Sequence, residues 1–129
     1  PIAEGLMKKY FGTSIYVQSV GVESEREIDG FAINVCKEIG VELSRHQVRN
    51  FDEMEALGDQ LVEFDIVIAL SRASHIKVMN LVENKKSKVE YWPVIDPIFN
   101  SERREEKLIV YRAIRDQIDT LIFDRFSKE

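Results

Sequence analysis

The sequence is poor in cysteine, with a single residue of this type, Cys36, among 129. One thiol forms neither an intramolecular disulfide nor a cysteine-rich zinc site, and it is typical of a reducing compartment, so we expect a cytoplasmic protein. The histidines His46 and His75 do not complete a ligand set with Cys36 at any familiar spacing. We therefore expect no metal ion and no cofactor.

Positive charge is also scarce. Lys and Arg total 18 against 23 Asp and Glu, giving a net charge of -5 and a pI of about 5.2. The basic residues are scattered, which argues against a nucleic-acid partner. No apolar run has the length of a membrane span and no signal-peptide pattern is present, so we expect no membrane partner.

The order of the elements predicts the fold class. With 44% hydrophobic residues, the chain is long enough to bury a core, and we expect a single domain over residues 1–129. Helical and strand-like segments alternate, which predicts an α/β fold of three layers, with a parallel sheet flanked by helices on both faces. The expected elements are helices at 1–11, 31–39, 54–61, 72–82 and from about 102, strands at 14–20, 65–70 and 87–92, and a loop at 21–30.

Polar side chains follow the expected strands. They are Ser19, Ser71 and Asp96, and ligands of open α/β sheets bind where the strands end. Asp96 has Trp92 and Phe99 nearby, and an apolar setting raises the pKa of a carboxyl group and suits it to general acid catalysis. The alternative, which the residues alone favour, is that Asp96 and the proline after it only turn the chain.

The remaining reactive side chains have ordinary explanations. Cys36 lies on or beside the apolar face of an expected helix, so core packing is favoured over nucleophilic chemistry. His75 is expected on a helix surface and His46 in a polar connection. The motifs G-x-S-x-G, G-x-x-x-x-G-K-[ST] and G-x-G-x-x-G do not occur.

Six segments, in their order along the chain, resemble the low-molecular-weight protein tyrosine phosphatase family and its relatives among the arsenate reductases. The segments are PIAEGLMKKYFG, YVQSVG, IDGFAINVCKEIGVELSRHQVRNF, FDIVIALSRASH, YWPVIDPIF and YRAIRDQIDTLI. The resemblance implies a phosphotyrosine phosphatase I-like fold and the hydrolysis of phosphomonoesters through a phosphocysteine. Its implied partner is a phosphotyrosine protein or a small phosphoester.

The resemblance also implies roles for individual residues. Asp96 would be the general acid that protonates the leaving oxygen and later activates water. Trp92 would line the aromatic substrate cleft.

Other implied roles concern the support of the phosphate loop. Ser19 and His46 match positions that hold this loop in shape. Pro1 and Glu4 begin the helix whose N-terminal amides would face the bound phosphate.

The chain departs from the family at its start. The nucleophilic cysteine and the phosphate-binding arginine of the Cys-x-x-x-x-x-Arg loop are missing, together with the first strand, which the resemblance places centrally in the sheet order 2-1-3-4. We therefore expect an N-terminally incomplete, truncated domain, or a domain that closes the gap by direct pairing of strands or by borrowing from a second copy, which predicts a homodimer.

Whether the chain is an enzyme stays open at this point. The leading interpretation is a phosphatase-like hydrolase that is inactive as given. One alternative is a non-catalytic interaction module on the same scaffold, and another is an arsenate reductase-like protein. Thioredoxin-coupled arsenate reduction is disfavoured. The resemblance implies that this route needs further cysteines near Ser71, and the sequence has none there.

We expect no measurable hydrolysis of p-nitrophenyl phosphate by the purified 129-residue chain, because the sequence holds no Cys-x-x-x-x-x-Arg loop. A colorimetric assay of released p-nitrophenol checks this expectation. Turnover that Asp96→Asn abolishes would contradict it.

Overall fold

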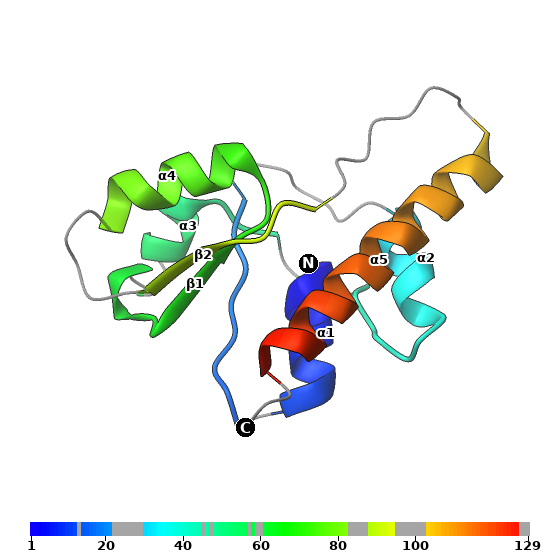
Figure 1. Cartoon of the computed structure of the whole chain (residues 1–129), viewed down its shortest axis with the longest axis horizontal. Coiled ribbons are helices and arrows are strands. Elements are labelled where there is room, and N and C mark those ends of the chain that lie inside the picture. The colour runs from blue at the N-terminus through cyan, green and yellow to red at the C-terminus, as the bar shows by residue number, and fades with distance from the viewer. Residues whose placement is uncertain are drawn as a thin grey trace. The chain divides into compact units, whose positions relative to one another are not determined.

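A computed structural model of the chain describes residues 1–12, 14–21, 30–44, 46, 48–56, 58, 61–82, 88–94 and 103–126. The elements are α1 (Ile2–Phe11), α2 (Gly30–Lys37), α3 (Phe51–Ala56), the 3-10 helix η1 (Leu61–Glu63), β1 (Ile66–Ala69), α4 (Arg72–Val82), β2 (Lys88–Tyr91) and α5 (Arg104–Phe126) (Figure 1). The described residues form two compact units. Unit 1 contains α1, α2 and α5, and unit 2 contains α3, η1, β1, α4 and β2.

Unit 2 is built on a β-α-β motif. Strands β1 and β2 pair in parallel, with Ile66 opposite Lys88 and Ala69 opposite Tyr91. Helix α4 makes the connection between them, as parallel pairing requires. The Ser74 N–H donates to Ser71 Oγ at 3.2 Å, so a serine cap starts α4. The strands expected at 65–70 and 87–92 and the helix expected at 72–82 are confirmed.

The short helix α3 starts with a reciprocal cap. The Glu53 N–H donates to Asn50 Oδ1 at 2.8 Å, and the Asn50 N–H donates to Glu53 Oε1 at 3.1 Å. This capping box fixes the start of α3 at Phe51, whereas periodicity alone predicts a helix over 54–61. That boundary is wrong, because the helix ends at Ala56 and η1 follows as a separate turn.

One hydrophobic cluster fills unit 2. Helices α3 and α4 cover the face of the β1–β2 pair that presents Val67 and Val89. Apolar residues one helical turn apart place Val78 and Val82 on the inner side of α4. The buried members are Phe51, Met54, Leu61, Val67, Val78 and Val82.

The strand expected at 14–20 is not formed, although its residues have high β propensity. Among the described residues, the backbone pairing next to this segment is an isolated parallel bridge between Gly21, which directly follows it, and Asn50. Tyr16 is 64% exposed. Propensity favours an extended backbone but supplies no hydrogen-bonding neighbour. In the sheet order that the resemblance implies, the only neighbour of this segment is the first strand, and the described residues include no such strand.

Unit 1 packs α5 against both α1 and α2. Helix α5 contributes a stripe of isoleucines at four-residue spacing, which is the period of one helix face. Cys36 is fully buried, which confirms its expected place in the core. The buried hydrophobic residues of this unit are Ile2, Leu6, Met7, Ala32, Val35, Cys36, Val41, Leu43, Ile114, Ile118 and Ile122.

Two arginines of α5 form hydrogen bonds with the C-terminal end of α2 and with the glutamate that follows it. The Arg115 guanidinium donates to the Val35 carbonyl and to Glu38 Oε1, both at 2.8 Å, and Arg112 donates to Glu38 Oε2 at 2.7 Å. Arg115 thereby pairs a helix C-terminal carbonyl that has no partner within its own helix. The hydrogen bond from Arg112, helped by Arg115, lowers the pKa of Glu38 to about 2.

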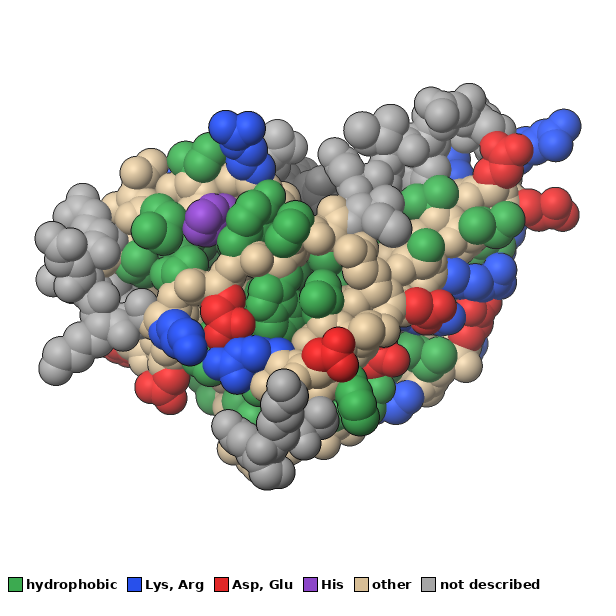
Figure 2. Space-filling view, in the orientation of Figure 1, with side chains coloured by type: hydrophobic (Ala, Val, Ile, Leu, Met, Phe, Trp, Pro, Cys, Tyr) green, Lys and Arg blue, Asp and Glu red, His purple; other side chains and the backbone are tan. Residues whose placement is uncertain are grey.

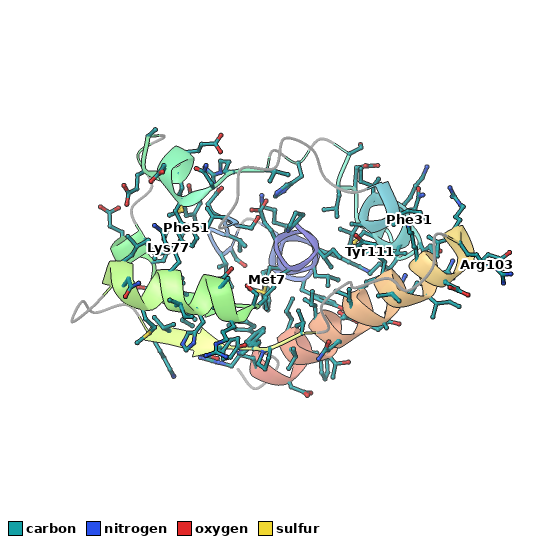
Figure 3. The ribbon with its side chains drawn as sticks, turned by 90° about the horizontal axis from the view of Figure 1, so that it is seen from above. Met7, Phe31, Phe51, Lys77, Arg103 and Tyr111 are labelled. Atoms are coloured by element: carbon teal, nitrogen blue, oxygen red, sulfur yellow. The ribbon has the colours of Figure 1, made fainter. Side chains whose placement is uncertain are left out.

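Aromatic contacts complete the packing of α5. The Phe31 ring stacks on Tyr111, with centroids 5.9 Å apart. Figure 3 labels both residues, which come from α2 and α5. At the other end of α5, the Phe126 ring meets Phe11 edge-on at 5.9 Å. Such pairs contribute about 0.5–1.5 kcal/mol beyond the area that they bury.

Among the described helices, none has the combination of length and hydropathy that a bilayer span needs.

Glycine at position 5 permits the close approach of α1 to the segment after α2. A Cβ atom on Gly5 would lie 2.7 Å from Val41 Cγ1 and 2.8 Å from Leu43 Cδ2. Both partner side chains are buried, so they have little room to move. Helix α1 therefore has glycine, a poor helix former, at a position where the side chain of a better helix former would collide with Val41 and Leu43.

We predict that Gly5→Ala destabilises the protein by about 1–3 kcal/mol, the usual cost of overpacking. This loss should exceed the gain of about 1 kcal/mol that alanine brings to a helix interior. Urea unfolding measures the change. The matched control is Gly30→Ala, since a Cβ at that position of α2 meets nothing within 4 Å. Equal stability of the two variants would contradict the close approach.

Candidate functional site

Helix α1 begins directly after Pro1. The Gly5 N–H donates to the Pro1 carbonyl at 2.9 Å, which is the first hydrogen bond of the helix. Pro1 itself is exposed and provides no side-chain cap. The amides ahead of Gly5 therefore belong to the first turn, where N–H groups have no intrahelical acceptor and attract anions.

A carboxylate is buried in this first turn. Glu4 is only 7% exposed, and a charge at such a place needs partners. Lys8 Nζ donates to Glu4 Oε2 at 2.9 Å, one turn along the helix. His46 Nδ1 lies 3.1 Å from the same oxygen.

His46 also reaches the segment that precedes unit 2. Its Nε2 lies 3.4 Å from Ser19 Oγ. A carboxylate accepts but does not donate, so we assign the ring proton to Nδ1, which leaves Nε2 as an acceptor. The Ser19 hydroxyl has a single proton, which it donates either to this nitrogen or to the Glu4 carboxylate. We call Glu4, Lys8, Ser19 and His46 the Glu4 cluster.

Opposing effects set the protonation of the Glu4 cluster. Burial raises the pKa of Glu4, but the hydrogen bonds from Lys8 and Ser19 and the positive charges nearby outweigh it and lower the pKa overall. Burial lowers the pKa of His46, and the attraction of Glu4 only partly offsets it. The cluster therefore favours an ionised carboxyl group beside a neutral imidazole.

The structure brings three of the predicted site residues together. Glu4, Ser19 and His46 are joined in one cluster within unit 1. Pro1 lies at the start of the same helix with its ring exposed. Sequence reasoning missed Lys8, although its spacing of four residues from Glu4 is typical of a helical ion pair.

The other predicted site residues lie elsewhere. Trp92 follows β2 in unit 2, where its Nε1 donates to Glu90 Oε1 at 3.2 Å and its backbone N–H donates to the Ala69 carbonyl at 2.8 Å. Asp96 lies outside the described residues. Ser71 is used by the cap of α4. Within the described ranges, no group of three or more His, Cys, Asp and Glu side chains is placed to hold a metal ion.

Known proteins resemble the chain over most of its length. The sequence model of the family described as "Low molecular weight phosphotyrosine protein phosphatase" matches residues 1–124. An arsenate reductase of Halalkalibacterium halodurans is 31% identical over 117 residues, which is 91% of this chain and 78% of that protein.

Solved structures share the fold. An arsenate reductase in its oxidized state superimposes with a TM-score of 0.75 at 24% identity, covering 98% of this chain and 86% of that one. Wzb of Vibrio vulnificus, in complex with benzylphosphonate, gives a TM-score of 0.69 at 18% identity, covering 96% and 88%. At these identities the likeness establishes the fold alone. The expected α/β class, with a parallel sheet flanked by helices, is confirmed.

We predict that the free energy of unfolding falls as the pH drops below 6.5, the ordinary pKa of histidine. The pKa of His46 is lower in the folded state, so the unfolded chain binds the proton first and stability decreases until the pH passes the folded pKa. A second decrease should begin below 4.5, because the lowered pKa values of Glu4 and Glu38 have the same sign of effect.

Urea unfolding across this pH range measures both decreases. His46→Gln should remove the upper decrease and keep the lower one. His75→Gln is the matched control, because it removes the other imidazole and leaves the Glu4 cluster intact. A stability curve of His46→Gln that runs parallel to the wild type between pH 6.5 and 4.5 would refute the assignment.

Proposed function

The chain belongs to the low molecular weight phosphotyrosine protein phosphatase family, and on this premise we propose that it functions in the hydrolysis of phosphomonoesters, with phosphotyrosine as the substrate group. The observation that carries the proposal is the Glu4 cluster at the first turn of α1. This turn is where the resemblance to the family places the bound phosphate.

The Glu4 cluster fixes the surroundings of the proposed phosphate site. Glu4 belongs to α1, Ser19 to the segment before unit 2, and His46 to the connection after α2. Their hydrogen bonds hold these segments at the positive end of the helix dipole, which favours a phosphate. We assign Glu4, Ser19 and His46 as positioning residues that act through the phosphate-binding loop.

Asp96 and Trp92 complete the proposal. We assign Asp96 as the general acid that donates its proton to the leaving phenolic oxygen as the P–O bond breaks, and that afterwards takes a proton from the attacking water. Trp92 stands four residues earlier, directly after β2. This places its indole at the carboxyl end of a strand, where ligands of parallel sheets bind.

Arsenate reduction is the second candidate, because the matching curated protein of H. halodurans is an arsenate reductase. Reduction by thiol exchange needs reactive thiolates. Cys36 is fully buried, and burial raises the pKa of its thiol. Ser71 and Ser74 stand at the start of α4, where they form its cap. Hydrolysis through a phosphocysteine needs the one thiolate of the phosphate-binding loop, whereas thiol exchange needs further thiolates, so the serines at the start of α4 favour phosphoester hydrolysis.

The test uses a version of the chain preceded by a strand and a Cys-x-x-x-x-x-Arg loop. We expect it to hydrolyse p-nitrophenyl phosphate and phenyl phosphate. Asp96→Asn should lower kcat about 100-fold or more on phenyl phosphate, the typical contribution of a general acid. The loss should be smaller on p-nitrophenyl phosphate, because nitrophenolate leaves without the help of a proton.

Asp124→Asn is the matched control, since this aspartate is exposed on α5 and should leave both rates unchanged. Equal rates for Asp96→Asn and the parent on both esters would remove Asp96 from the mechanism. Arsenate reduction in the presence of thioredoxin, without phosphatase activity, would overturn the proposed function.

A further inference from the structure

The chain that leaves β2 stays paired to the end of β1. The Trp92 N–H donates to the Ala69 carbonyl at 2.8 Å, and the Val94 N–H donates to the Leu70 carbonyl at 3.4 Å. Both donors come after Tyr91, the last residue of β2. All five residues belong to unit 2. The backbone is therefore fixed as far as Val94, at the carboxyl edge of the parallel pair.

Tyr91 holds this segment from the side of α4. Side chains of successive residues in an extended chain point to opposite faces of a sheet. Val89 packs against the core that α4 covers, so Tyr91 lies on the same face. The Tyr91 ring stacks on His75 of α4, with centroids 4.6 Å apart and planes 7° from parallel. Figure 2 shows the histidine of α4 among hydrophobic side chains. The stack ties the end of the strand to the helix.

Glu90 holds the indole of Trp92 on the other face. Trp92 Nε1 donates to Glu90 Oε1 at 3.2 Å, and both side chains are half-buried. The two residues are two positions apart, so an extended chain places their side chains on one face of the pair. The N–H is the one polar group of an indole, and a carboxylate is an acceptor only. This hydrogen bond therefore defines the orientation of the ring.

An aromatic ring that is oriented before a ligand arrives binds it more tightly. A side chain that is free to turn loses rotational freedom on binding, which weakens affinity about two- to tenfold. Here the end of β2 is held from both faces, by His75 through Tyr91 and by Glu90 through Trp92. The indole is thus preorganised at the edge where ligands of parallel sheets bind.

We propose that Glu90 is a positioning residue: its carboxylate orients the indole of Trp92, and the oriented indole packs against the aromatic ring of the substrate. The contact with the substrate rests on the proposed function, whereas the orientation of the indole does not. Glu90 acts through Trp92 and takes no part in the steps that make or break bonds.

Trp92 is the single tryptophan of the 129-residue chain, so its fluorescence reports the orientation directly. Glu90→Ala should lower the steady-state anisotropy of this fluorescence and raise its quenching by acrylamide, because the indole loses its fixed partner. Glu90→Gln should restore the parent values, since the side-chain amide keeps an oxygen that accepts the N–H. Glu63→Ala is the matched control, because Glu63 is exposed on η1 in the same unit.

The effect on the substrate is measured in the version with the Cys-x-x-x-x-x-Arg loop. Glu90→Ala should raise KM for p-nitrophenyl phosphate about two- to tenfold and leave kcat unchanged. The inhibition constant of inorganic phosphate should also stay unchanged, because phosphate has no ring to meet the indole. Trp92→Phe keeps a ring but removes the N–H, so it should raise KM equally, and Glu90→Ala should add nothing in that background.

Unchanged anisotropy and quenching in Glu90→Ala would overturn the proposal, and so would additive effects of Glu90→Ala and Trp92→Phe on KM. Loss of cooperative urea unfolding in Glu90→Ala but not in Trp92→Phe would also contradict it, because the carboxylate would then serve the fold rather than the indole. A freed indole with an unchanged KM would refute the contact with the substrate. A freed indole without hydrolysis in any version would end the proposed function and leave the orientation by Glu90 in place.

Discussion

The buried carboxylate of Glu4 is the constraint on which the proposed phosphate site depends. An ionised group removed from water costs several kcal/mol unless charged or polar partners surround it. Here the partners are Lys8, Ser19 and His46. Only Lys8 comes from the same helix, so satisfying one carboxylate requires two loop segments to meet the first turn of α1. Geometry useful for binding an anion thus follows from an electrostatic requirement of folding.

Packing around the same helical turn reinforces this arrangement. Gly5 follows Glu4 and lets α1 lie directly on Val41 and Leu43. These residues belong to the connection that leads to His46. A wider separation would move the imidazole away from the carboxylate and weaken the attraction that partly offsets the effect of burial on the pKa of His46. The apolar contact and the polar cluster are therefore two parts of one constraint, in which steric fit sets the distances over which charges interact.

Local patterns in the sequence predict much of the fold and part of the site. Ser71 as a cap and the apolar run before it correctly define α4 and β1, because these signals act between near neighbours. The segment 14–20 has strand propensity but lacks a strand partner within the described residues, and propensity carries no information on partners. Likewise, neither Glu4 nor His46 reveals the other, because their contact joins positions far apart in the sequence.

The chemistry of the Glu4 cluster suits one part of the proposed function. In unit 1, the Glu4 cluster uses buried polar groups, which demand accurate geometry and suit the positioning of a phosphate. A phosphate group alone is common to every phosphoester. Discrimination between substrates must then come from contacts outside the phosphate site.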